Sequence, residues 1–147
     1  MNQFSANIAE EIFANYPEWR SFAREEKSKN EGTYLYVEIQ APTAANTVHG
    51  LCISTDNDEV TVSFDFYHSH FEHWAVREAG FEYEAALPFV QALLSESVAV
   101  ASWWQGEQWC GSCQVEAGEQ PELTVVREFN RIRVRSWLGK RNEDRDA

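Results

Sequence analysis

Apolar residues recur at intervals of four at the start of the chain, as they do along one face of an amphipathic helix. Ser5 stands where an N-cap residue would satisfy the free backbone amides of such a helix. A second short helix is predicted after Pro17, because proline suits the first turn of a helix. Residues 1–30 are therefore expected to form a helical N-terminal segment. The apolar positions of the first helix are Phe4, Ile8, Ile12 and Tyr16.

From residue 33 onward the spacing of apolar residues changes to two, which predicts strands. The acidic residues at 55–58 form a turn between two of them. Helical spacing returns at 84–97, and the charged tail at 140–147 is expected to fray. The predicted extended segments cover 33–40, 47–54, 59–70, 98–117 as a hairpin or bulged pair, and 122–139.

Short connections between neighbouring strands favour an antiparallel sheet. We predict a single α+β domain over residues 1–147, with a sheet of about six strands and helices packed mainly on one face. A chain of this length can bury a core without disulfides or a metal ion. Aromatic residues make up 14% of the chain, so many rings are expected in that core.

The chain is strongly acidic, with 24 Asp and Glu residues against 12 Lys and Arg and a net charge of -12. The imbalance is uneven, because residues 1–126 carry a net charge of -15 and residues 127–147 one of +3. An acidic surface repels nucleic acid and anionic membranes, whose phosphates are held by Lys and Arg. Acidity also serves solubility, but if a charged partner exists, a basic protein is the one favoured.

Neither a membrane span nor a secretory signal is predicted. No segment approaches the roughly 18 apolar residues that a spanning helix requires. The N-terminal sequence MNQFSANIAEEIF is not basic and is not followed by an apolar signal core. We therefore expect a cytoplasmic protein whose three cysteines are reduced thiols.

Three histidines lie within six positions at the end of the run EVTVSFDFYHSHFEHW. Strand alternation would place His68 and His70 on the apolar face of their strand, and His73 follows three residues later. Two histidines on one strand face can chelate a metal ion, and His73 could supply a third nitrogen. The pattern favours a structural or partner-contact role and leaves a metal-binding protein or metal-dependent enzyme as the alternative.

Two other patterns suggest local structure more than chemistry. Cys110 and Cys113 flank Gly-Ser, a pair that suits a hairpin turn and would set the thiols opposite each other. Arg131, Arg133 and Arg135 share one strand face, which is typical of a phosphate-binding stripe or of a solvated face that offsets neighbouring acids across the sheet. The acidic net charge favours the second interpretation. Sequence motifs of nucleophilic enzymes are missing, so no catalytic residue and no cofactor are predicted.

The segment from His49 to Trp74 contains HGLCIS, a short acidic turn and EVTVSFDFYHSHFEHW. It resembles the small acidic immunity proteins encoded beside bacterial polymorphic toxins, including those of contact-dependent growth inhibition systems. The resemblance implies a cytoplasmic protein that binds its cognate toxin domain, often a nuclease, and blocks its active site or its access to substrate. Contacts in such pairs are specific to each pair, so the resemblance assigns no binding residue.

An immunity protein that is not an enzyme would need carboxylates beside exposed rings, because nuclease surfaces are basic and Trp and Tyr anchor tight interfaces. Turns and irregular segments expose side chains, which favours the turn at 55–59 and the segment 71–84 as contact surfaces. The tryptophans of the predicted hairpin offer another surface. The candidate contacts are Asp56, Asp58, Glu59, Glu72, Trp74, Glu78, Glu82 and Glu84, with Trp103, Trp104 and Trp109 in the hairpin.

Overall fold

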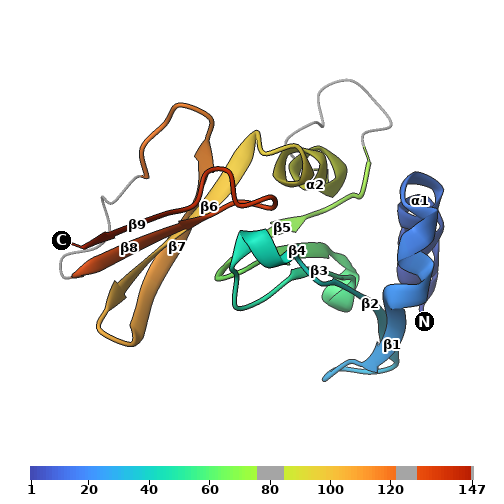
Figure 1. Cartoon of the computed structure of the whole chain (residues 1–147). Coiled ribbons are helices and arrows are strands. Elements are labelled where there is room, and N and C mark those ends of the chain that lie inside the picture. Colours follow the sequence, from blue (N-terminus) through green and yellow to red (C-terminus); the bar gives the residue numbers. More distant parts are fainter. Residues whose placement is uncertain (76–84, 122–128, 147) are drawn as a thin grey trace. The chain divides into compact units, whose positions relative to one another are not determined.

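The computed structural model describes residues 1–75, 85–121 and 129–146 and has an α+β fold built on two antiparallel sheets (Figure 1). One sheet has five strands and the other has four. The predicted α+β class is confirmed, but the single sheet of about six strands is wrong. In the described ranges, no helix is both long enough and apolar enough to cross a membrane.

The helical elements are α1 (Gln3–Asn15), η1 (Pro17–Phe22), η2 (Thr43–Ala45), η3 (Asp56–Asp58) and α2 (Ala86–Leu94). The first sheet has the order β1-β2-β3-β4-β5 and the second has the order β7-β6-β8-β9. The strands of the first sheet are β1 (Ala23–Lys27), β2 (Thr33–Ile39), β3 (Leu51–Ser54), β4 (Val60–Phe64) and β5 (Tyr67–Phe71). The strands of the second sheet are β6 (Val98–Gln105), β7 (Gln108–Glu116), β8 (Arg131–Arg135) and β9 (Glu143–Asp146).

The chain divides into two compact units, each made of segments that are separate in the sequence. Unit 1 comprises Met1–Gln40, Leu51–Ser63 and His68–Val90. Unit 2 comprises Ala41–Gly50, Phe64–Tyr67 and Gln91–Ala147. The two units are described separately below.

α1 begins at Gln3, before the residue that the sequence predicts as its N-cap, Ser5. Asn2 is its N-cap, and the Asn2 side chain accepts a hydrogen bond from the Ser5 backbone amide at 2.9 Å. The prediction of Ser5 as the cap is therefore wrong. Ser5 is instead buried inside the first turn, where its hydroxyl lies 2.7 Å from the hydroxyl of Thr55. The amphipathic face buries Ile8 and Ile12, as predicted.

Residues 23–27 form a strand and not the predicted second helix. The helical turn of η1 ends at Phe22, and β1 then pairs antiparallel with β2, from Ala23 opposite Val37 to Lys27 opposite Thr33. The sequence AREEK has good helix formers, but the backbone of β2 offers a complete ladder of hydrogen bonds. Tertiary pairing therefore overrides the local helical preference.

The first sheet buries one side of each of its three central strands. The side chains on that side are branched or aromatic, which suits a pleated sheet surface. α1 packs in contact with β2 and η1, and its Ile12 has no exposed surface. The buried strand residues are Leu35, Val37, Ile39, Leu51, Ile53, Val60, Val62 and Phe64.

A tight turn divides the predicted strand at 59–70 into β4 and β5. Asp65 occupies the turn with a positive φ of 52°, and its buried carboxylate accepts from the backbone amide of Val48 at 2.8 Å. The turn changes which side chains face the core, because strand alternation starts anew after it. His68 and His70 are consequently exposed, so their predicted position on the apolar face is wrong.

The hairpin of β6 and β7 turns at residues 106–107, five residues before the predicted Gly-Ser turn. Cys110 and Cys113 therefore lie on the same strand, and they do not face each other across a hairpin. Gly111 lies opposite Trp103 in the ladder, and the Trp103 ring occupies the space above it. A side chain at residue 111 would collide with that ring, so glycine allows the indole to pack across β7.

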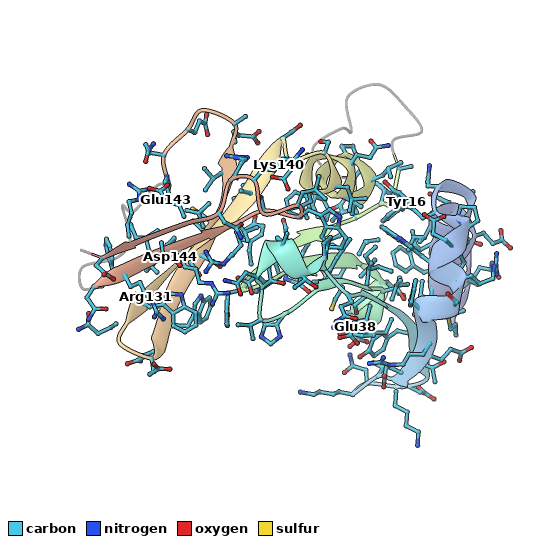
Figure 2. All side chains as sticks on the ribbon, in the orientation of Figure 1. Tyr16, Glu38, Arg131, Lys140, Glu143 and Asp144 are labelled. Carbon is cyan, nitrogen blue, oxygen red and sulfur yellow. The ribbon has the colours of Figure 1, made fainter. Side chains whose placement is uncertain are left out.

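The C-terminal residues form β9, so the prediction of a frayed tail at 140–147 is wrong for its described part. β9 pairs with β8, whose Arg131 lies opposite Asp146. Figure 2 labels Arg131 together with Glu143 and Asp144 of β9. Arg135 is buried and donates to both carboxylate oxygens of Asp144, at 2.8 and 3.2 Å. Its Nε also donates to the carbonyl of Asn46 at 3.1 Å. The predicted offset of an acid across the sheet is present at this pair, but Arg135 is buried, so the prediction of a solvated arginine face is wrong at this residue.

The Arg135–Asp144 pair should make stability depend on pH at acid values. The hydrogen bond from Arg135 lowers the pKa of Asp144 below its ordinary value of 3.8. The stabilisation is therefore fully present above pH 3.8 and is lost as the pH falls through the lower pKa of the folded state. Asp144→Asn should remove this part of the pH dependence. The change in the free energy of unfolding should be about 1 kcal/mol or less, because Asp144 is mostly exposed. Urea unfolding between pH 2 and 6 measures it, with the exposed Glu107→Gln as the control; equal pH profiles for both variants would contradict the expectation.

Candidate functional site

The turn between β3 and β4 has a special backbone held by buried hydroxyl groups. Asn57 and Asp58 both have positive φ values, of 60° and 55°, a conformation that Asn and Asp tolerate better than other residues. The Thr55 hydroxyl next to them is buried and accepts from the Leu35 backbone amide at 2.9 Å. These contacts fix the acidic turn against β2.

Each residue of this turn is also bonded to another segment of unit 1. The donors come from the N-cap of α1 and from the connection between β1 and β2, so three segments meet at one end of the first sheet. The bonds are Ser28 Oγ to Asp56 Oδ1, Asn30 Nδ2 to Asn57 Oδ1 and Asn2 Nδ2 to Asp58 Oδ1, each 2.7 Å long.

A polar pocket of about 210 Å³ lies among these three segments, and we call it the turn pocket. Its walls carry hydroxyl, amide and carboxylate groups and no Lys or Arg side chain. The three carboxylates, from Glu31, Asp56 and Asp58, make the lining anionic. The lining residues are Asn2, Ser5, Ser28, Asn30, Glu31, Thr33, Tyr34, Thr55, Asp56, Asn57 and Asp58.

The side of the first sheet opposite its buried residues bears polar and aromatic side chains, and we call it the open face. None of its residues is buried, and Tyr34 belongs both to this face and to the turn pocket. The open face and the turn pocket together form the acidic surface of unit 1. The residues of the open face are Arg24, Glu26, Tyr34, Tyr36, Glu38, Cys52, Ser54, Thr61, Ser63, His68 and His70.

Tyr36 is held in place at the centre of the open face. The Arg24 guanidinium lies over its ring, 4.5 Å from the centroid, and pairs with Glu26 and with Glu38 at 3.5 Å. The Tyr36 hydroxyl donates to Cys52 Sγ at 3.3 Å. This hydrogen bond, followed by burial, raises the pKa of Tyr36, so the phenol stays neutral at physiological pH. Tyr36 is therefore an oriented, uncharged ring beside carboxylates.

His70 does not have the geometry of a catalytic base. Its Nδ1 lies 2.8 Å from Glu59 Oε1 and 2.9 Å from Thr61 Oγ1, so the acid and the hydroxyl share one ring nitrogen. A base that activates a hydroxyl needs the acid on one nitrogen and the hydroxyl on the other. His68 lies beside His70, and the centroids of the two rings are 5.2 Å apart. Glu59 therefore orients the His70 ring. Glu59 is not part of the lining of the turn pocket.

The three histidines do not form the predicted alternative metal site among the residues that the structure describes. His68 and His70 are neighbours on β5, whereas His73 follows the strand, in a bridge with Ala85. Within the described ranges, no group of three His, Cys, Asp or Glu side chains is arranged to hold a metal ion.

The turn acids predicted as partner contacts are only partly brought together. Asp56 and Asp58 line the turn pocket, whereas Glu59 pairs with His70 on the open face. Glu72 is exposed, in the irregular segment after β5. The remaining acids of that prediction, Glu78, Glu82 and Glu84, lie outside the described residues.

Three of the four tryptophans predicted as surface contacts are buried, so their predicted exposure is wrong. Trp74 has no exposed surface, because its indole is anchored within unit 1 by Asn15 and Tyr16. Trp103 and Trp104 are 6% and 8% exposed. Both lie on β6, a central strand of the second sheet with neighbours on either side. Trp109 on the edge strand β7 remains exposed, at 46%.

Sequence reasoning missed the contribution of β2 to the candidate site. Tyr34, Tyr36 and Glu38 alternate with the apolar residues of their strand, so the period of two places them opposite the core. That signal could have identified them as surface residues. The pocket residues Asn2 and Ser28 carry no comparable signal, because only folding brings them to the turn at 56–58.

Most of the negative charge of the chain belongs to unit 1. Its segments contain 14 acidic and five basic residues, a net charge of -9, compared with -3 for unit 2. Comparison with family models, curated proteins and solved structures found no match to this chain. The function proposed below therefore rests on the residues and geometry of the chain itself.

Proposed function

We propose that the protein is an immunity protein that binds and neutralises a basic toxin domain, most readily a nuclease such as an RNase. The observation that carries the proposal is the turn pocket, a polar cavity whose lining includes three carboxylates and no basic side chain. It belongs to a unit with a net charge of -9. A cationic side chain of a partner is the ligand that this lining favours, because charge-assisted hydrogen bonds to carboxylates are the strong ones.

Tyr34 and Tyr36 supply the apolar part of the proposed contact. Tyrosine anchors many tight interfaces because it buries a large, rigid ring and still offers a hydroxyl group. Tyr36 loses little conformational freedom on binding, since Arg24 and Cys52 already hold it. The surrounding carboxylates would steer a basic domain toward the surface and speed association at low salt.

In this proposal the protein acts by occupying the surface that the toxin uses for its substrate. Carboxylates at the interface stand where the phosphates of a nucleic acid would bind. No chemistry, metal ion or cofactor of this chain is required, and the proposed compartment is the cytoplasm, where the toxin would meet its substrate. Protection of a cell requires a dissociation constant near nanomolar, roughly -12 kcal/mol.

The test of the proposal is rescue of growth by coexpression. The adjacent upstream reading frame should encode a basic, toxic C-terminal domain, and coexpression of this chain should restore growth and yield a purified complex. If the domain stays toxic and no complex forms, the protein is not its immunity protein.

The contribution of the turn pocket is tested by Asp56→Asn combined with Asp58→Asn. Asparagine Oδ1 can still accept from Ser28 and Asn2, so the turn keeps its hydrogen bonds while two charges are removed. The dissociation constant should rise about thirtyfold or more, since a lost charge contact at an interface costs about 2 kcal/mol or more.

The matched control is Glu107→Gln combined with Glu119→Gln, which removes the same net charge from exposed positions of unit 2. Its dissociation constant should change less than about threefold, through weaker steering alone. Calorimetry with the purified toxin domain measures both variants. Equal weakening of the two would show that only the overall charge matters and would remove the turn pocket from the proposed contact.

A further inference from the structure

His68 and His70 lie side by side on β5, an edge strand of the first sheet. Side chains two residues apart on a strand lie on the same side of the sheet. The centroids of the two imidazole rings are 5.2 Å apart. Both side chains are exposed, and that of His70 keeps 52% of its surface. The function proposed above assigns no role to this pair of imidazoles.

The spacing of the two rings agrees with that of two ligands of one metal ion. A transition-metal ion lies about 2.0 to 2.1 Å from an imidazole nitrogen, in line with the ring. Two imidazoles at two corners of a tetrahedron around one ion therefore have centroids about 5 Å apart. The separation of His68 and His70 matches this value, so a nitrogen of each ring can reach a shared ion by rotation of exposed side chains.

Glu59 determines which nitrogen of His70 is available to a ligand. Its Oε1 lies 2.8 Å from His70 Nδ1, and Thr61 Oγ1 lies 2.9 Å from the same nitrogen. A carboxylate beside a ring nitrogen holds the proton there, so the lone pair of the ring lies on Nε2. Histidines that bind metal ions almost always donate their other ring N–H to such a group, which fixes the ring and makes the ligating nitrogen more basic. The arrangement that excludes a catalytic base therefore suits a metal ligand.

We propose that His68 and His70 bind one divalent transition-metal ion of the class that prefers imidazole, such as Zn²⁺ or Ni²⁺, with Glu59 as the positioning residue. His73 takes no part, because it lies beyond the end of β5. Among the described residues, no third His, Cys, Asp or Glu side chain completes a group of ligands. Water fills the remaining positions around the ion, since both histidines are exposed.

The surroundings of the pair favour a cation of this class. Unit 1 has a net charge of -9, which attracts a divalent ion. Arg24 is the one Lys or Arg among the described residues of the open face, and it lies on β1, at the opposite edge of the sheet from β5. Imidazole nitrogen suits zinc, copper and nickel, whereas magnesium and calcium require oxygen ligands. The two rings therefore select a transition metal.

Calorimetric titration with Ni²⁺, on the chain without a histidine tag, tests the site. Ni²⁺ is the probe because it favours imidazole, whereas the thiolates of the three free cysteines favour softer ions. The wild type should bind one Ni²⁺ per chain. His68→Ala and His70→Ala should each raise the dissociation constant at least about tenfold, because each removes a ligand. Circular dichroism should show an unchanged fold, since both side chains are exposed.

Glu59→Gln tests the positioning residue, because glutamine keeps an oxygen for His70 Nδ1 but removes the charge. Loss of a supporting acid should raise the dissociation constant for Ni²⁺ about tenfold or more. Glu10→Gln is the matched control, since it removes the same charge from an exposed position of α1, and it should change the constant less than about threefold. His73→Ala should keep the affinity of the wild type.

A wild-type chain that binds no Ni²⁺ across the micromolar range overturns the proposal. So do unchanged affinities in both His68→Ala and His70→Ala, which would place the ion elsewhere. A loss in His73→Ala as large as theirs overturns the two-histidine site in favour of a three-histidine cluster. Equal affinities of Glu59→Gln and Glu10→Gln overturn the role of Glu59. The titration uses this chain alone, so its outcome is independent of toxin binding.

Discussion

Trp74→Ala should lower the free energy of unfolding by about 3 to 5 kcal/mol, the range typical for removal of a large buried ring. The indole has no exposed surface, and its Nε1 donates to Asn15 Oδ1 at 2.9 Å. Its ring also meets Tyr16 edge-on, with centroids 6.5 Å apart. Alanine would leave a cavity and remove the donor for a partly buried amide. Urea unfolding followed by circular dichroism measures the loss.

Two variants separate burial from the loss of an aromatic ring. Trp109→Ala removes the same side chain from a position that is 46% exposed and should cost less than about 1 kcal/mol. Trp74→Phe keeps a ring in the core and should cost less than Trp74→Ala. If Trp74→Ala were as mild as Trp109→Ala but abolished partner binding, Trp74 would be a surface contact and its described burial would be contradicted.

Gly139→Ala should destabilise unit 2 by roughly 2 kcal/mol or more, because it combines backbone strain with a collision. Gly139 has a φ of +76°, a conformation that residues with a side chain adopt at a cost. A Cβ at this position would lie 2.8 Å from the carbonyl carbon of Ala44 and closer still to its oxygen. The neighbouring Asn142 side chain donates to the Ala45 carbonyl at 2.8 Å, which limits how far this loop can move away. The melting temperature and urea midpoint should both fall.

Gly118→Ala separates the cost of backbone strain from the cost of the collision. Gly118 has a similar φ of +82°, but no atom lies within 4 Å of the position that a Cβ would take. This variant should show the cost of backbone strain alone, about 1 kcal/mol. The difference between Gly139→Ala and Gly118→Ala measures the collision with Ala44. Equal losses for both variants would contradict the close approach of these two loops.

The parts of the fold that follow from local periodicity were predicted well. The helix around Ile8 and Ile12 forms as α1, and the alternating segments at 33–40 and 47–54 contain β2 and β3. In each case the buried side chains are those that the spacing of three to four or of two indicates. The acidic residues at 55–58 also form a turn, because Asp and Asn tolerate its positive φ values.

The candidate site was predicted only where its residues belong to one turn. Asp56 and Asp58 are acids in a turn and were expected to be accessible, and both line the turn pocket. The pocket itself also needs Asn2 and Ser28, which reach that turn from segments 56 and 28 residues away in sequence. No pattern within a window of neighbouring residues contains that information.

The sequence by itself determined the amphipathic helix, the alternation of the central strands, the strong negative charge and the acidic turn, because each depends on residues close together in the chain. Tertiary structure alone decided which ring faces solvent and where each strand ends. Trp74 is buried because Asn15 and Tyr16 surround it, and His70 is exposed because the turn at Asp65 restarts the alternation. These outcomes depend on contacts between distant segments, whose free energies outweigh the local preferences.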